Sequence, residues 1–136
     1  MKIDRICLLD KENPYLKIKI NLTSDLIAGI EIKMFRPDES LIKSWKLAIP
    51  ENTKIEKDIS IEPNEINRGF LVWNAVVCSK NYKVSEGIFK MELIQDLKPL
   101  KLSSPIEKKV TGIPPCAIQQ TVEFTDALTF IVKGQS

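Results

Sequence analysis

Apolar and polar residues alternate along most of this chain, and the alternation predicts β-strands. The clearest stretches are 16–22 and 26–34, in which every second residue is apolar and most residues between are polar. The inward positions are Leu16, Ile18, Ile20, Leu22, Ala28, Ile30, Ile32 and Met34. A two-residue period gives each strand one buried and one wet face. A turn at 23–25 separates the stretches, so they could form a hairpin with Lys17 and Lys19 opposite Glu31.

The least polar stretch is 70–77, in which only Asn74 interrupts a run of aromatic, aliphatic and β-branched residues. A short apolar run of this kind predicts a strand that is buried on both faces. We expect one face to meet an opposite sheet. The other face should be covered by the long segment 97–115 or by a partner.

Further strands are expected along the rest of the chain. The next after 70–77 is 88–94, with Phe89, Met91 and Leu93 on one face; the others are 3–9, 54–62, 106–110, 118–124 and 128–132. The many charges in 54–62 are typical of an edge strand. Residues 41–49 fit either a strand or a helix, and we favour the strand because both neighbours are strands and a nine-residue helix is marginal.

Eight or nine short strands with turns between them predict an all-β fold, an antiparallel β-sandwich formed by one domain over residues 1–136. The strand around Trp73, followed by the alternating stretch 87–93, resembles the late strands of immunoglobulin-like sandwiches in general texture. The resemblance covers about a quarter of the chain and includes no cysteine pair, so it indicates an architecture and no particular family.

Composition is that of an ordinary globular protein. The chain has 136 residues, 43% hydrophobic and 28% charged, and a net charge of +2 spread along its length. No apolar run has the length of a signal peptide core or a membrane span. We therefore expect a soluble, cytoplasmic protein without membrane contact, although export by a signal-independent route stays open. Cys7, Cys78 and Cys116 are odd in number and widely spaced, so we expect buried, reduced thiols.

The residues needed for common chemistry are sparse. The chain has no histidine, which removes the usual general base and the commonest metal ligand. Its five glycines form no phosphate-binding motif. Carboxylates in the predicted strands lie on wet faces, where charge mainly serves solubility. We therefore predict no catalytic residues, no bound metal and no cofactor.

A few side chains are candidates for a contact surface. Trp45 lies in the ambiguous element, while Lys80, Tyr82 and Lys83 lie in a predicted loop, and loops on a rigid sandwich often bind partners. No basic stripe extends this loop, so nucleic-acid binding is not expected. The sequence favours a non-enzymatic protein–protein interaction or structural module, a subunit or adaptor, with a protein partner or a homo-oligomer. The alternative is a β-sandwich that binds a small ligand, either a carbohydrate or a lipid.

Overall fold

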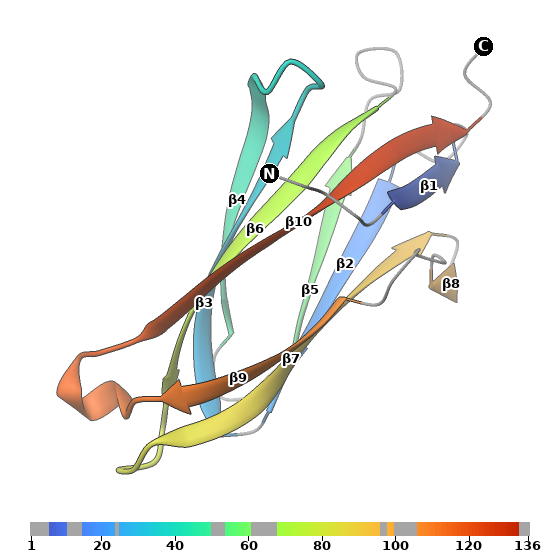
Figure 1. Ribbon diagram of the computed structural model, residues 1–136. Helices are drawn as coiled ribbons and strands as arrows, with labels where there is room; N and C mark the ends of the chain where they lie inside the picture. Colours follow the sequence, from blue (N-terminus) through green and yellow to red (C-terminus); the bar gives the residue numbers. More distant parts are fainter. Residues whose placement is uncertain are drawn as a thin grey trace.

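The computed structural model describes residues 6–10, 15–23, 25–49, 54–60, 68–95, 98–99 and 106–133. These residues form ten strands and one short 3₁₀ helix (Figure 1). The elements are β1 (Ile6–Asp10), β2 (Tyr15–Leu22), β3 (Leu26–Phe35), β4 (Leu41–Ile49), β5 (Lys54–Ser60), β6 (Arg68–Ser79), β7 (Ser85–Gln95), β8 (Lys98–Pro99), β9 (Ile106–Ile113), η1 (Cys116–Ile118) and β10 (Val122–Lys133). Residues 41–49 are therefore a strand.

The strands form two mostly antiparallel sheets that pack face to face, which confirms the predicted all-β sandwich. The first sheet has the order β1-β10-β6-β3-β4, and only β1 runs parallel to its neighbour. The second sheet has the order β5-β2-β7-β8, with β9 also paired to β7. Figure 1 shows the two layers, with the chain crossing repeatedly from one to the other.

The core lies between the sheets and is built from the alternating residues that the sequence predicted. Every inward position named above for β2, β3 and β7 is buried. From β6, the core receives Leu71, Trp73, Ala75 and Val77, all of which are at most 1% exposed. The buried residues form a cluster to which both sheets contribute, and Trp45 packs against it.

The hairpin expected between 16–22 and 26–34 is wrong. β2 pairs with β5 and β7 in the second sheet, whereas β3 pairs with β4 and β6 in the first. The chain crosses between the layers near Thr23, whose backbone N–H donates to the Ile88 carbonyl at 3.2 Å. Both arrangements bury one apolar face of each strand, so alternation alone did not distinguish them. Lys17 accordingly lies near Glu56 at 3.7 Å instead of Glu31.

Strand β6 is fully buried on one face only, which corrects the expectation for 70–77. Its outward residues, including Phe70, Val72 and Val76, are half-buried. The described strands of the segment expected to cover them, β8 and β9, join the second sheet instead, because both pair with β7. Asn74 lies on this outward face, which explains how a polar residue fits into the most apolar run of the chain.

The two closing strands expected at 118–124 and 128–132 are a single strand, β10, preceded by the 3₁₀ helix. β10 pairs with β6 from Val122 to Ile131, so its backbone stays hydrogen-bonded through the polar residues Thr125 and Asp126. The Thr125 hydroxyl donates to Asn74 Oδ1 at 2.8 Å, and Asp126 Oδ1 accepts from the Ala127 N–H at 2.8 Å. Side-chain bonds thus accommodate residues that resemble a turn in sequence.

Gly87 lies where β7 approaches the crossing between the layers, and we expect Gly87→Ala to destabilise the fold. A Cβ there would lie 2.5 Å from Leu26 Cδ1 and 2.9 Å from both Cβ and Oγ1 of Thr23. Overpacking of this kind costs about 1–3 kcal/mol. Gly29→Ala is the matched control, because an added Cβ on β3 meets nothing within 4 Å. Urea denaturation of both variants tests the contrast, and equal midpoints would contradict it.

Candidate contact surfaces

The outer face of the first sheet carries a row of side chains that crosses all five strands. Cross-strand register aligns Ile6 with Thr129, Thr129 with Phe70, Phe70 with Phe35, and Phe35 with Leu41. Paired residues project to the same side of a sheet, so these five form one transverse line, which we call the apolar row. Ile6 and Leu41, at its two ends, are 45% and 50% exposed.

The apolar row is extended at the β1 corner. Leu8 is 43% exposed and pairs with Ile131, whose side chain is half-buried. Thr129 is the only polar member of the row, and its side chain is also half-buried. Neighbouring exposed apolar groups of this kind are a feature of protein contact sites, whereas scattered ones carry no such meaning.

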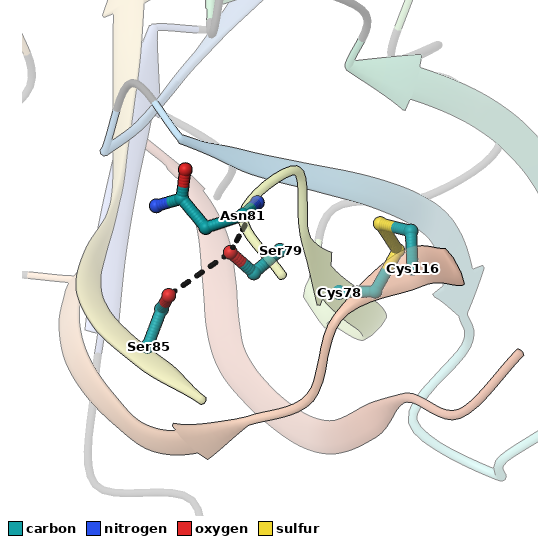
Figure 2. Close-up of a disulfide and its surroundings, with 5 residues drawn as sticks. All are labelled: Cys78, Ser79, Asn81, Ser85 and Cys116. Carbon is teal, nitrogen blue, oxygen red and sulfur yellow. Dashed lines mark hydrogen bonds between the residues drawn. A yellow bond between two sulfur atoms is a disulfide. The ribbon is translucent and has the colours of Figure 1, made fainter. Parts of the chain in front are cut away.

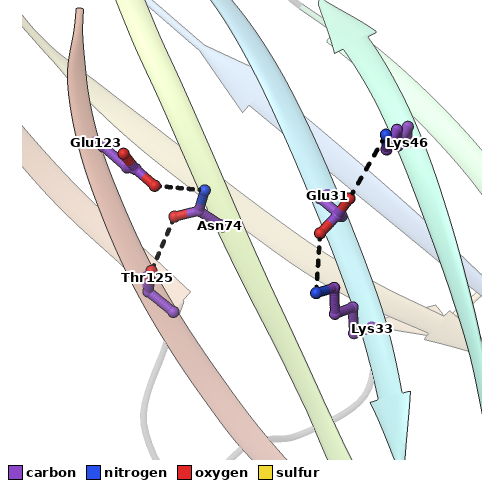
Figure 3. Close-up of polar contacts among 6 residues, drawn as sticks. All are labelled: Glu31, Lys33, Lys46, Asn74, Glu123 and Thr125. Atoms are coloured by element: carbon purple, nitrogen blue, oxygen red, sulfur yellow. Dashed lines mark hydrogen bonds and ion pairs between the residues drawn. The ribbon is translucent and has the colours of Figure 1, made fainter. Parts of the chain in front are cut away.

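A band of polar contacts crosses the same face further along the strands (Figure 3). Thr125, Asn74, Glu31 and Lys46 are aligned in one register row on β10, β6, β3 and β4. The Asn74 amide donates to Glu123 Oε1 at 2.8 Å. The Glu31 carboxylate lies 3.2 Å from Lys33 Nζ and 4.0 Å from Lys46 Nζ. These ion pairs contribute little stability, because their side chains are partly or, for Lys46, largely exposed. The face is therefore apolar at one end and polar across its middle.

The outer face of the second sheet has a different character. In this sheet β2, β5 and β7 direct mainly charged and amide side chains outward: Lys17, Lys19, Asn21, Glu56, Asp58, Lys90 and Glu92. Ile88, 39% exposed, is the large exposed hydrophobic residue on the described part of this face. The two outer faces of the sandwich are therefore unequal, and the first sheet presents the more apolar one.

The loop between β6 and β7 holds three of the four predicted contact residues, Lys80, Tyr82 and Lys83. Tyr82 is 91% exposed. Trp45 lies elsewhere, on β4 opposite Ile32, and its half-buried side chain packs against the core. The structure thus brings the loop residues together and separates Trp45 from them.

The base of this loop is held by a group of specific bonds (Figure 2). Ser79 Oγ lies 3.0 Å from Ser85 Oγ and accepts from the Asn81 N–H at 3.1 Å. The Ser79 N–H donates to the Pro114 carbonyl at 2.9 Å, and the Lys80 N–H donates to the Asp25 carbonyl at 2.8 Å. The loop is therefore presented from a fixed base even though its tip is exposed.

A disulfide joins Cys78, at the end of β6, to Cys116 in η1 (Figure 2). The expectation of three reduced thiols is therefore wrong for Cys78 and Cys116 and correct for Cys7, which is free and buried. The 38-residue separation and the absence of a motif concealed the pair in the sequence. Two features could have suggested it: Cys78 immediately follows the predicted central strand 70–77, and Pro114-Pro115 mark a break in the chain just before Cys116.

An open depression lies beside the β6–β7 loop. Five polar residues line it together with Val84 and Gly112: Asp25, Asn81, Lys83, Ser85 and Glu86. Tyr82 lies between two of these lining residues in the chain and is not itself part of the lining. This mixture of carboxylates, an amide and an ammonium group suits hydrogen bonding to a polar ligand better than enclosure of an apolar one.

Among the residues that the structure describes, two titratable groups have clearly shifted pKa values. Burial raises the pKa of the Cys7 thiol to about 12, so this residue is an unreactive part of the core. Hydrogen bonds from the hydroxyl and the backbone N–H of Ser40, at 2.6 and 2.9 Å, lower the pKa of Asp38. Asp38 is an exposed turn residue, and its bonds to Ser40 account for the shift as local turn structure.

Two further findings concern only the residues that the structure describes. No group of three or more cysteine, aspartate or glutamate side chains in those ranges is arranged to hold a metal ion. None of the described segments forms a helix with the length and apolar character needed to cross a membrane.

Comparison with known proteins gives no functional assignment. No family model matches the chain, and no curated protein sequence matches it. Among solved structures, the chain is similar to a crystal structure described as a domain of unknown function, DUF4425, from Bacteroides vulgatus ATCC 8482. The two are 13% identical with a TM-score of 0.49, over 88% of this chain and 97% of that chain.

Proposed function

We propose that this chain is a non-enzymatic module that works through protein–protein contact, as a subunit or adaptor of a larger assembly. The apolar row on the outer face of the first sheet is the observation that carries the proposal. It offers a partner an apolar strip across five strands, bordered by the Glu31, Lys33 and Lys46 charges that would fix orientation. Interfaces commonly combine an apolar centre with a polar rim in this way.

The outer face of the first sheet indicates what kind of surface its partner would need. A matching surface would place apolar side chains against Phe70, Phe35 and Leu41, and polar groups against the band through Asn74 and Glu31. Such a surface would be a folded protein face, because it would have to cover the apolar row and the parallel polar band at the same time. The absence of histidine from the sequence agrees with a role that requires no proton transfer.

Leu41→Glu tests this proposal. Leu41 is half exposed at the end of the row, so the substitution should change stability by less than about 0.5 kcal/mol. We expect a carboxylate there to abolish retention of a partner in affinity capture from the native cell, followed by mass spectrometry. Ile88→Glu is the matched control on the outer face of the second sheet. The proposal fails if every retained protein tolerates Leu41→Glu, or if both variants lose the same proteins.

A second candidate function is the binding of a small polar ligand, a carbohydrate, in the depression beside the β6–β7 loop. The polar lining and the adjacent exposed Tyr82 favour a carbohydrate over a lipid, since an aromatic ring can stack on a sugar. Tyr82→Ala, measured in parallel with the two variants above, separates the two functions. If Tyr82→Ala lost a bound ligand that Leu41→Glu retained, the result would favour carbohydrate binding in the depression.

The Cys78–Cys116 disulfide is informative about the cellular compartment in which the module functions. Disulfides persist in oxidising compartments and are rare in the cytoplasm. The disulfide therefore supports export, which the sequence left open, over the cytoplasmic residence that was expected. Thiol labelling of the chain taken from its native cell tests this point.

A further inference from the structure

The edge of the first sheet that β4 forms leaves part of the core incompletely covered. β4 pairs with β3 on one side, and no other described strand pairs with it. Its inward side chains Trp45 and Leu47 pack against the core but are only half-buried. Their cross-strand partners on β3, Ile32 and Ile30, are at most 3% exposed. The core is therefore closed at β3 and still partly open one strand further out.

The charges on β4 distinguish this edge from the other described edges. β4 contains two lysines, Lys43 and Lys46, and no carboxylate. Both lysines are exposed, and the Lys46 side chain is 85% exposed. The other described edge strands of five or more residues each contain an acidic residue: Asp10 in β1, Glu56 and Asp58 in β5, and Glu107 in β9. Within the described residues, β4 is thus the edge best matched to an acidic partner.

We propose that an acidic, extended segment of a partner protein adds to β4 as a further strand beside residues 43–48. In strand addition, main-chain hydrogen bonds supply affinity and alternate side chains supply specificity. The added strand would place apolar side chains next to Trp45 and Leu47 on the inner face, and carboxylates next to Lys46 on the outer face. This site goes beyond the proposed function, because it takes an extended segment at a sheet edge, whereas the apolar row takes a folded surface.

An acidic segment fits this edge better than a second copy of the chain. Opposite charges on neighbouring strands stabilise the pair, whereas like charges destabilise it. Two β4 strands side by side would bring the lysines of both copies to one seam that holds no carboxylate. The nearby Glu31 carboxylate lies 3.2 Å from Lys33 Nζ and 4.0 Å from Lys46 Nζ, so its closer ion pair is with Lys33 (Figure 3). The Lys46 ammonium group is therefore accessible to a carboxylate of the partner.

Binding of two synthetic peptides to the full chain tests the proposal. In one peptide of about ten residues valine alternates with glutamate, and in the other valine alternates with lysine. Isothermal titration calorimetry should show saturable binding of the glutamate peptide, at least tenfold tighter than binding of the lysine peptide. The variant Lys43→Glu/Lys46→Glu should reverse this preference, because the seam would then be acidic.

A matched control separates strand addition from general attraction between charges. Lys90→Glu/Lys109→Glu makes the same change of net charge at two exposed positions of the second sheet and should keep the native preference. The proposal is overturned if the native chain binds neither peptide or binds both equally. It is also overturned if the control variant reverses the preference as Lys43→Glu/Lys46→Glu does.

Hydrogen exchange locates the bound glutamate peptide without any substitution. An added strand should slow exchange of the amides between residues 43 and 48 that face the edge, and leave the amides of β9 unchanged. Protection confined to strands other than β4 would overturn the placement. Peptide binding at the edge needs no partner on the apolar row, and the Leu41→Glu capture experiment needs no peptide, so the two proposals can fail separately.

Discussion

Removal of the Cys78–Cys116 disulfide is expected to lower the free energy of unfolding by about 4 kcal/mol, the loop-closure entropy for a separation of this length. The cross-link joins residues 38 apart and connects the end of β6 to the segment between β9 and β10. Without it, the unfolded chain gains freedom that the folded sandwich does not share. The measurement is urea denaturation of the double variant Cys78→Ser/Cys116→Ser beside the native chain.

The third cysteine, Cys7, should not interfere with this experiment. Its thiol is buried with a pKa raised to about 12, so alkylating reagents should not modify it in the folded chain at neutral pH. Reducing agent should therefore destabilise the native chain and leave the double variant unchanged. A native chain that unfolds at the same urea concentration with and without reductant would contradict the prediction.

The local pattern was enough to predict β2, β3 and β7, which each have one buried and one wet face. Residues such as Ile18, Ile30 and Met91 alternate with polar neighbours, and burial of their apolar faces requires no knowledge of the strand order. The pattern could not predict which strands pair with each other. β2 and β3 have the same alternation whether they pair as a hairpin or lie in two different sheets. Only the competition among all strands for partners places them in different sheets.

The apolar row could not have been found in the sequence for the same reason. Its members come from five strands, of which only β3 and β4 are consecutive in the chain, and Thr129 and Leu41 are unremarkable in their local context. Only strand order and register align them. The loop residues Lys80, Tyr82 and Lys83 were accessible to sequence reasoning, because polar residues between two apolar strands already predict an exposed turn.

Trp73→Ala is expected to cost about 3–5 kcal/mol of folding free energy, which is a large part of the stability of an ordinary domain. Trp73 is 1% exposed at the centre of β6, the middle strand of the first sheet. Its indole fills space between the layers, and alanine would leave a cavity that a strand held on both sides by β3 and β10 cannot close. Thermal or urea unfolding followed by circular dichroism measures the loss.

Two further aromatic substitutions show whether burial sets this cost. Tyr82→Ala removes a side chain that is 91% exposed and should change stability by less than about 0.5 kcal/mol. Trp45→Ala should fall between the two, because Trp45 is half-buried on the edge strand β4, where neighbours can relax. If Trp73→Ala cost no more than Trp45→Ala, β6 would not be the strand around which the core is packed.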